Sequence, residues 1–442
     1  MRKKTIVLIL LSFWLSAGAQ EKWTLKRCIE FGLINNKSNS VYVNEKLAAD
    51  ARAREALSDY LPKVSITSTI DNNLKLQQSV IPAGIFGPNE LKVSLSQKYS
   101  SNATAQLDQV LYDQSMLTGL RAGKYNKQQA QLNIEQNQEA IIYNISGAYF
   151  QILVYQQQLE LLEHNVQTYQ KQIEIYRLQV VKGVALQKDL DKVSVDYNNA
   201  NSQIRVAQSN IVLAENELKF EMGYPIGDQL LIDDSKKVMI PFDLESKPNT
   251  FSPSLRVDYK LSELNIKVLE IEQARIKAGG LPKLTGYFRY GAVGFGNDLK
   301  GAYDQLLPFS AVGLKLSIPI FDFFKRSAQY KQAKINRVNA VVNLELSEGK
   351  YRVEYENARS KFLQAQINVE NDQRNVGLAE SVLKVTDLQF QKGTTNLTDW
   401  LNTQNALKDA QNSYLKSLFD YYQARVDLEK ATGTLKNFYN SL

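Results

Sequence analysis

Apolar residues recur every three or four positions along two stretches of the chain, which is the period of a helix packed along one side. In the first stretch these positions are Tyr197, Ala200, Ile204, Ala207, Ile211, Ala214 and Leu218. Adding 210 to each number gives Leu407, Ala410, Tyr414, Ser417, Tyr421, Ala424 and Leu428 in the second stretch. A heptad seam with small residues at alternate positions lets neighbouring helices approach closely, so each stretch is predicted to be a coiled-coil-like helix.

A proline-free segment precedes each of these helices. The two segments run from about residue 115 to 181 and from about 325 to 391, and both are rich in Gln, Asn, Glu, Lys, Leu and Tyr. At about 1.5 Å per residue, roughly 65 helical residues would be on the order of 100 Å long. A compact globular core does not need a helix of that length, whereas filamentous coiled coils and tall helical barrels are built from such helices.

The pattern changes to alternation upstream of each long helix, which predicts strands with one apolar face. Two strands are expected in each half of the chain, and the alternating positions that indicate them include Val64, Ile66, Ile70, Leu284, Phe288, Tyr290, Val312, Leu314, Leu316, Ile318 and Ile320. Turn-forming residues at 81–88 and 291–297 predict the loop between the strands of each pair. The chain therefore has four predicted strands.

The order of these elements occurs twice. Leu-Pro-Lys stands at 61–63 and 281–283, Lys-Gly at 182–183 and 392–393, and a later glycine at Gly223 and Gly433. Such internal similarity is typical of a duplicated architecture. We predict tandem repeats at 20–223 and 254–433, a linker at 224–253 and a C-terminal tail at 434–442.

The N-terminus has the order of a secretory signal. Residues 2–4 are basic, residues 6–15 are mainly apolar, and a run of small residues ends at Ala19. The apolar run is about half the roughly 20 residues that a membrane-spanning helix needs. We therefore predict a signal peptide at residues 1–19 and export from the cytoplasm.

Charge and rare residues exclude several classes of function. The formal charge is +7, and basic residues alternate with acidic ones, which argues against nucleic acid as a partner. Cys28 and His164 are the only residues of their types, so an internal disulfide and a histidine-cluster metal site are excluded within one chain. We interpret Cys28 as a small core residue and His164 as a surface or packing residue. We expect no enzyme activity, no cofactor and no metal.

Four strands are too few to close a barrel, for which about eight is the working minimum. A strand edge left open in lipid would carry unsatisfied backbone groups. If the strands span a membrane, the chain must oligomerise, and three copies would supply 12 strands. The aromatic residues near the second strand pair would then suit a membrane-interface girdle, and they are Tyr287, Phe288, Tyr290, Phe295 and Tyr303.

The chain resembles the TolC family of outer-membrane efflux proteins over essentially its whole mature length. The matching segments are residues 23–36, 60–64 and 316–322 and the two glycine helix turns, in duplicated order and with matching spacings. The resemblance implies a mixed α and β membrane protein in the outer membrane. It also implies a homotrimer with a 12-stranded β-barrel in outer-membrane lipid, four strands per chain, continuing into a long periplasmic α-helical barrel.

The resemblance also implies the roles of particular residues. The helix turns where the family docks its periplasmic adaptor match Lys182, Gly183, Val184, Ala185, Lys392, Gly393, Thr394 and Thr395. In the family the pore narrows at these turns, and Asp399 matches a gate aspartate, with Asn402 in place of a second one. Asp189 matches a residue of the family's closing clamp, but Phe390 stands where a tyrosine is expected and Thr395 where an arginine is expected.

The expected function is that of a passive exit duct in a tripartite efflux pump for small molecules. An inner-membrane transporter would supply the energy and a periplasmic adaptor would link it to the duct. The same duct serving type I protein secretion is a close alternative. A periplasmic coiled-coil scaffold without a pore is a third interpretation, and the alternating strands argue against it.

Overall fold

The computed structural model describes residues 22–94, 96–233 and 251–442, and the chain divides into two compact units. Unit 1 comprises Met1–Asn44, Leu132–Leu261 and Leu344–Leu442, and unit 2 comprises Glu45–Gln131 and Ser262–Asn343. The predicted signal peptide at 1–19 lies outside the described residues, as does most of the predicted linker at 224–253. Each unit draws on both halves of the chain.

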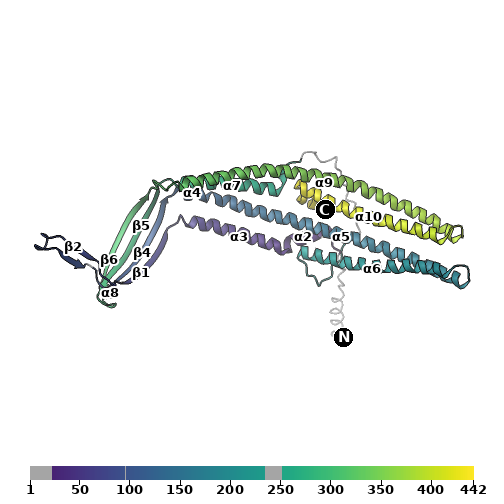
Figure 1. Cartoon of the computed structure of the whole chain (residues 1–442), viewed down its shortest axis with the longest axis horizontal. Coiled ribbons are helices and arrows are strands. Elements are labelled where there is room, and N and C mark those ends of the chain that lie inside the picture. Colours follow the sequence, from purple (N-terminus) through teal and green to yellow (C-terminus); the bar gives the residue numbers. More distant parts are fainter. Residues whose placement is uncertain (1–21, 95, 234–250) are drawn as a thin grey trace, which may run out of the picture. The chain divides into compact units, whose positions relative to one another are not determined.

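The elements follow one another in the order shown by the colours of Figure 1. The helices are α2 (Leu25–Asn35), α3 (Lys37–Ser58), α4 (Gln114–Leu120), α5 (Ala122–Val181), α6 (Gln187–Met222), α7 (Val257–Ala278), α8 (Gly301–Asp304), α9 (Lys325–Gln391), α10 (Leu397–Thr432) and α11 (Leu435–Ser441), with a 3-10 helix at Pro253–Leu255. The strands are β1 (Lys63–Asn72), β2 (Gln78–Ile81), β3 (Leu91–Ser94), β4 (Tyr99–Tyr112), β5 (Lys283–Gly296) and β6 (Leu306–Ser317). Within the described ranges, no helix is both long and apolar enough to cross a membrane.

The long helices form as predicted. The second runs over the predicted residues 325–391 as α9, and the first is α5, with 60 residues, preceded by the short α4. Helices α6 and α10 have 36 residues each, and adding 210 to either bound of α6 gives the bound of α10. The predicted seam is confirmed on α6, where the small residues Ala200, Ala207 and Ala214 are buried.

The core of unit 1 joins α5 to α10 and α9. The ring of Phe150 stacks on Tyr422 with centroids 4.5 Å apart, and Phe362 packs against Tyr421 at 5.4 Å. Fully burying side chains of this kind stabilises a fold by about 1.5–3 kcal/mol each. Cys28 is part of this core and fully buried, as predicted. The predicted tail at 434–442 forms α11, whose apolar side chains also enter the core.

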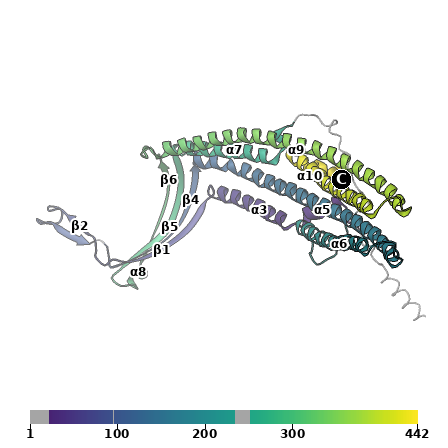
Figure 2. The ribbon, with the colours of Figure 1, turned by 45° about the vertical axis from the view of Figure 1, so that its right-hand side comes forward.

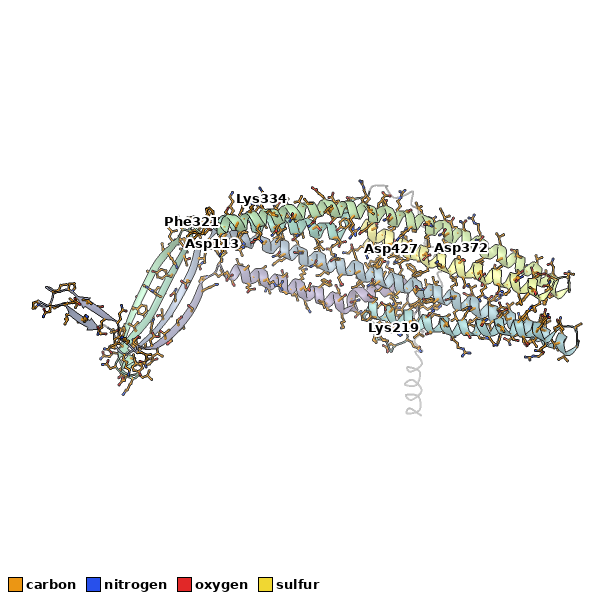
Figure 3. The ribbon with its side chains drawn as sticks, in the orientation of Figure 1. Asp113, Lys219, Phe321, Lys334, Asp372 and Asp427 are labelled. Carbon is orange, nitrogen blue, oxygen red and sulfur yellow. The ribbon has the colours of Figure 1, made fainter. Side chains whose placement is uncertain are left out.

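A polar contact reinforces the same interface. The Tyr143 hydroxyl donates a 2.8 Å hydrogen bond to Oδ1 of Asp427, which Figure 3 labels. The Lys430 ammonium lies 4.2 Å from the centre of the Tyr143 ring. Burial, followed by the Asp427 carboxylate, raises the pKa of Tyr143 to about 12. The hydroxyl therefore stays protonated and remains a hydrogen-bond donor.

Unit 2 contains the four predicted strands as one antiparallel sheet in the order β1-β4-β5-β6. Figure 2 shows these strands side by side, with a two-stranded hairpin of β2 and β3 beyond one end of the sheet. This hairpin was not predicted, and the first predicted loop, 81–88, lies mostly in the connection between its two strands. Strand β6 begins earlier than expected and ends at Ser317, so Ile318 and Ile320 lie beyond it.

The prediction of a second loop at 291–297 is wrong. Strand β5 continues through Gly296, and the connection to β6 lies at 297–305 and contains α8. The glycines serve close packing rather than a turn, because a side chain at Gly294 or Gly296 would overlap the backbone of α8. Glycine marks both turns and close backbone approaches, and the sequence pattern did not separate the two.

The two faces of the sheet differ in polarity. Residues in direct register across an antiparallel pair lie on the same face, and Val64, Leu107, Phe288 and Val312 form one row across all four strands. Val312 is 83% exposed, so the predicted apolar face is confirmed and is not covered by the rest of the unit. The opposite face is polar along β1 and β4 and mixed along β5 and β6, where Val293, Leu307 and Phe309 also lie on it. Tyr287 and Phe295 lie on that opposite face, so the five aromatic residues do not form one girdle.

Candidate functional site at the helix turns

The turns after α5 and α9 in unit 1 have the same backbone. The Val184 amide donates to the Gln179 carbonyl at 2.9 Å and the Gly183 amide to the Val180 carbonyl at 3.0 Å. In the second turn the corresponding bonds run from Thr394 and Gly393 to the carbonyls of residues 389 and 390 at 2.9 and 3.0 Å. This pair of bonds around a left-handed glycine is a Schellman helix end. The turns at Gly183 and Gly393 are therefore matched in geometry.

Both turn glycines need a positive φ, and neither is crowded. Gly183 has φ 74° and Gly393 has φ 72°, a region that side-chain-bearing residues rarely adopt. No atom lies within 4 Å of the position that a Cβ would take at either glycine. Lys182 and Lys392 are exposed, and Ala185 and Thr395 are half-buried. The turns thus present their outer surface to solvent.

An aromatic cluster lies directly behind the turns and was not predicted. Trp400 of α10 is fully buried, and its ring lies 6.3 Å from Tyr169 of α5 and 6.0 Å from Phe390 of α9. The Trp400 indole N–H donates to Oδ1 of Asp387 at 3.3 Å. The cluster packs the α5–α6 hairpin against the α9–α10 hairpin. The seven-residue spacing of Tyr169 and Tyr176 was the sequence signal that could have revealed it.

Asp399 and Asn402 follow the second turn. The Asn396 side chain caps α10 by accepting a 2.9 Å hydrogen bond from the Asp399 amide. The Thr395 hydroxyl donates to Oδ2 of Asp399 at 3.2 Å. Asp399 and Asn402 are both exposed. The structure therefore brings Thr395 and Asp399 together at the start of α10, and the assignment of Asp399 and Asn402 to a gate stays a prediction.

The structure places Asp189 and Phe390 around Tyr176. Phe390 stacks on Tyr176 with ring centroids 5.9 Å apart. Burial, followed by the negative charge of Asp189, raises the pKa of Tyr176 to about 12. Within the described part of the chain, no hydrogen bond or ion pair joins Asp189 to Phe390 or Thr395. Within one chain, Asp189 and Phe390 therefore meet at Tyr176 through an electrostatic effect and aromatic packing, and the clamp stays a prediction.

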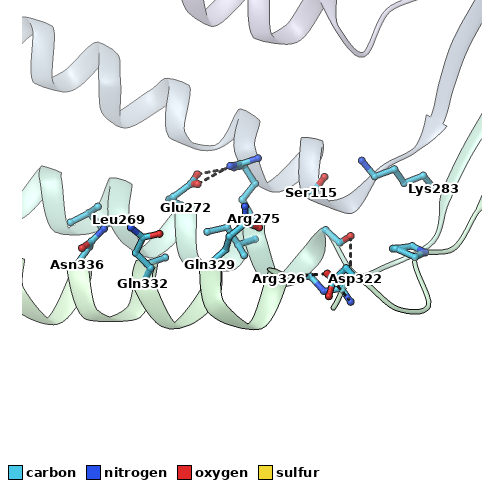
Figure 4. A pocket seen from close by; sticks show the side chains of 14 residues that line it. Ser115, Leu269, Glu272, Arg275, Lys283, Asp322, Arg326, Gln329, Gln332 and Asn336 are labelled. Atoms are coloured by element: carbon cyan, nitrogen blue, oxygen red, sulfur yellow. Dashed lines mark hydrogen bonds and ion pairs between the residues drawn. The ribbon is translucent and has the colours of Figure 1, made fainter. Parts of the chain in front are cut away.

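Unit 2 contains a pocket of about 620 Å³ between α7 and α9 (Figure 4). Arg275 donates two 2.7 Å hydrogen bonds to the Glu272 carboxylate, and Arg326 lies 3.7 Å from Asp322. The charges on the wall pair with one another, so the pocket is a polar junction between helices. Among the described residues, no group of His, Cys, Asp and Glu is arranged to hold a metal ion.

A sheet with one apolar and one polar face, together with long paired helices that end in exposed turns, defines a class of protein. It is the class of outer-membrane channels with a β domain and a helical-barrel domain. The family model described as "Outer membrane efflux protein" matches residues 44–224 and 272–434, which is most of the chain. The protein belongs to the outer membrane efflux protein family.

Relatives and solved structures agree with this assignment. The chain is 24% identical over 347 residues to the outer membrane protein TolC of Vibrio cholerae, and the alignment covers 76% of this chain and 77% of that protein. It is 23% identical over 339 residues to the alkaline protease secretion protein AprF of Pseudomonas aeruginosa, covering 75% and 69%. The CmeC outer membrane channel of Campylobacter jejuni has the same fold, with a TM-score of 0.74 at 18% identity over 94% of this chain and 88% of that one. The protein is an outer-membrane exit duct for efflux or secretion, with a periplasmic helical part.

Proposed function

We propose that three copies of this chain form a passive duct that exports small molecules as part of a tripartite efflux pump. Each copy contributes four strands to a 12-stranded barrel and its long helices to a periplasmic helical barrel. An inner-membrane transporter supplies the energy, and a periplasmic adaptor joins it to the duct. The chain itself is built from tandem repeats at 20–223 and 254–433, joined by the segment 224–253.

The four-stranded sheet is the observation that carries this proposal. Its outer strands, β1 and β6, each have only one partner among the described residues. Unpaired strand edges are costly in lipid, and four strands cannot close by themselves. The apolar face suits lipid and the polar face suits a water-filled lumen. Pairing β6 of one copy with β1 of the next satisfies every edge when three copies close the ring.

Exposed apolar lines on the helices support the same assembly. On α6 the exposed residues Val206, Leu213 and Phe220 are seven positions apart. On α9 the exposed apolar residues include Leu363, Ile367, Leu378, Val382, Val385 and Leu388. Such lines mark coiled-coil seams, and large exposed apolar stretches mark interfaces. Helices of neighbouring copies would cover them.

The exposed turns support adaptor docking. Val181 is 82% exposed and Val184 is 75% exposed, although both are apolar. Leu186 is exposed beside them. A partner that covers these side chains would gain the free energy of removing apolar surface from water. The gate would lie just behind, at Asp399 and Asn402.

Purified protein tests the assembly directly. We expect the detergent-extracted outer-membrane form to have the mass of a trimer and to open water-filled pores in planar bilayers. Leu316 lies on the apolar face and Ser317 on the polar one. Leu316→Arg should lower trimer yield, because a charge in lipid costs about 2–4 kcal/mol near the midplane. Ser317→Arg is the matched control, and equal yields from both variants would contradict the assigned faces.

Protein secretion is the second candidate, and the relative named for alkaline protease secretion favours it. A deletion strain distinguishes the two functions. Efflux predicts greater sensitivity to small toxic compounds with unchanged secreted protein. Secretion predicts the loss of particular proteins from the medium with unchanged sensitivity.

A further inference from the structure

The polar face of the sheet carries charged residues of both signs, and only some of them have a local ion-pair partner among the described residues. The charged residues of the strands on this face are Lys63, Asp71, Asp108, Lys283, Arg289 and Lys315. Four are basic and two are acidic. Lys63 pairs with Asp59 at 2.8 Å and Lys283 with Asp113 at 2.8 Å, so two of the cations are neutralised locally.

Arg289 is an uncompensated cation near the middle of β5. It is exposed, and within the described residues no carboxylate lies within ion-pair distance of its guanidinium. Asp108 is on the neighbouring strand, but its two carboxylate oxygens each accept a 2.9 Å hydrogen bond from Gln106. The guanidinium carbon lies 5.7 Å from the centre of the Tyr287 ring.

The residues beside Arg289 on the polar face do not rise far above the sheet, so the Arg289 side chain projects from the surface. Tyr287 lies flat over Gly313, where a Cβ would be 2.5 Å from the tyrosine oxygen. Phe309 lies over Gly291 in the same way, with a Cβ position 2.8 Å from its ring. Aromatic rings laid over glycines in this manner fill the space of missing side chains and keep the sheet surface flat. Arg289 stands in the row between these two flat pairs.

We propose that Arg289 is a specificity-determining residue of the duct, which favours anionic solutes such as carboxylates and phosphates in the sheet section. This inference rests on the proposed trimer, in which the polar face lines the lumen and three copies of Arg289 form a ring. Rings of Arg or Lys select anions in other pores. Lys315, on the same face and also without an ion pair among the described residues, adds to the field closer to the helices.

Ion selectivity of purified full-length trimers in planar bilayers tests the proposal. The reversal potential in a potassium chloride gradient gives the chloride-to-potassium permeability ratio. Arg289→Gln should lower this ratio roughly threefold at about 0.1 M salt, where the Debye length is about 10 Å. The difference should fade at about 1 M salt, where the Debye length is about 3 Å. Inorganic pyrophosphate should reduce the conductance of the wild type more than that of Arg289→Gln.

Three further variants keep the test decisive. Arg289→Lys keeps the charge and should retain the wild-type ratio. Ala311→Arg, directly opposite in register on β6, should raise the ratio. Lys92→Gln removes the same charge from the β2–β3 hairpin, outside the four-stranded sheet, and should change nothing. Conducting trimers in which Arg289→Gln matches Lys92→Gln would overturn this inference alone, whereas trimers that open no pores would overturn the proposed function with it.

Discussion

The turn after α5 and the turn after α9 share a backbone but differ in their side chains. Both glycines have nearly the same φ, and both helix ends make the same pair of hydrogen bonds. The first turn carries Val184 and Leu186 where the second carries Thr394 and Asn396. Asn396 caps the following helix, whereas Leu186 makes no side-chain cap. The second turn is therefore held by local polar bonds, and the first is an exposed apolar surface.

The residues behind the two turns differ as well. Trp400 follows the second turn and is fully buried, and its counterpart after the first turn, Leu190, is only half-buried. Asp399 is exposed, and its counterpart Asp189 is half-buried near Tyr176. The two turns thus share a backbone but differ in role. The α9–α10 hairpin supplies the buried anchor residue, Trp400, and the α5–α6 hairpin supplies the exposed apolar surface.

The largest expected effect comes from removing the anchor. Trp400→Ala should destabilise the turn end of unit 1 by about 3–5 kcal/mol, because the aromatic cluster would lose its central side chain and leave a cavity. Limited proteolysis and hydrogen exchange of the turn amides measure this effect. Val184→Ala is the control and should stay within about 0.5 kcal/mol. Equal protection in the two variants would show that the cluster does not hold the hairpins together.

Both turns should respond to the loss of glycine. Gly183→Val and Gly393→Val should each cost about 1–2 kcal/mol, because a β-branched residue resists a left-handed conformation. Trimer abundance should stay near normal and efflux should be lost, as expected of docking turns. Gly183→Asn and Gly393→Asn are the matched controls, since Asn tolerates this conformation. Loss of the trimer itself would identify the turns as assembly elements.

Capping should affect the two turns in opposite directions. Asn396→Ala removes the cap of α10 and should cost about 1 kcal/mol of local stability. Leu186→Asn introduces a cap at the start of α6 and should add stability of similar size, while weakening adaptor binding by removing an apolar side chain. Amide exchange in the first turn of each helix measures the first effect, and pull-down with the adaptor measures the second. A cap that strengthens adaptor binding would refute the apolar docking surface.

The smallest expected effect concerns ion preference. Asp399→Asn should shift the permeability ratio towards anions and weaken block by multivalent cations at the turn end, because a ring of three carboxylates would be lost. Asn402→Asp lies three residues further on the same helix face and should strengthen the block. Asp189→Asn is the matched variant in the first turn and should leave both properties unchanged. Conductance measurements in which Asp399→Asn equals the wild type would remove Asp399 from the gate.

Much of the fold could be predicted because helix and strand periods are local properties. The absence of proline and the heptad seam located α5, α6, α9 and α10 closely, and alternation located the apolar face of β6. The structure of residues 291–297 could not be predicted correctly, because the glycines there are required by close packing against α8 rather than by a turn. The offset of 210 residues between α6 and α10 was visible in the sequence alone.

The candidate site divides in the same way. The turn glycines follow from the sequence, because a helix end is set within a few residues, whereas the gate role of Asp399 was predicted from the family resemblance. The aromatic cluster does not follow from the sequence, because it joins Tyr169, Phe390 and Trp400 from three different helices. Likewise, the charge pattern of the sheet depends on which strands are neighbours, so the isolation of Arg289 became visible only when β4, β5 and β6 were paired. Period and turn chemistry are encoded locally, whereas burial and charge compensation depend on residues that only the tertiary fold brings together.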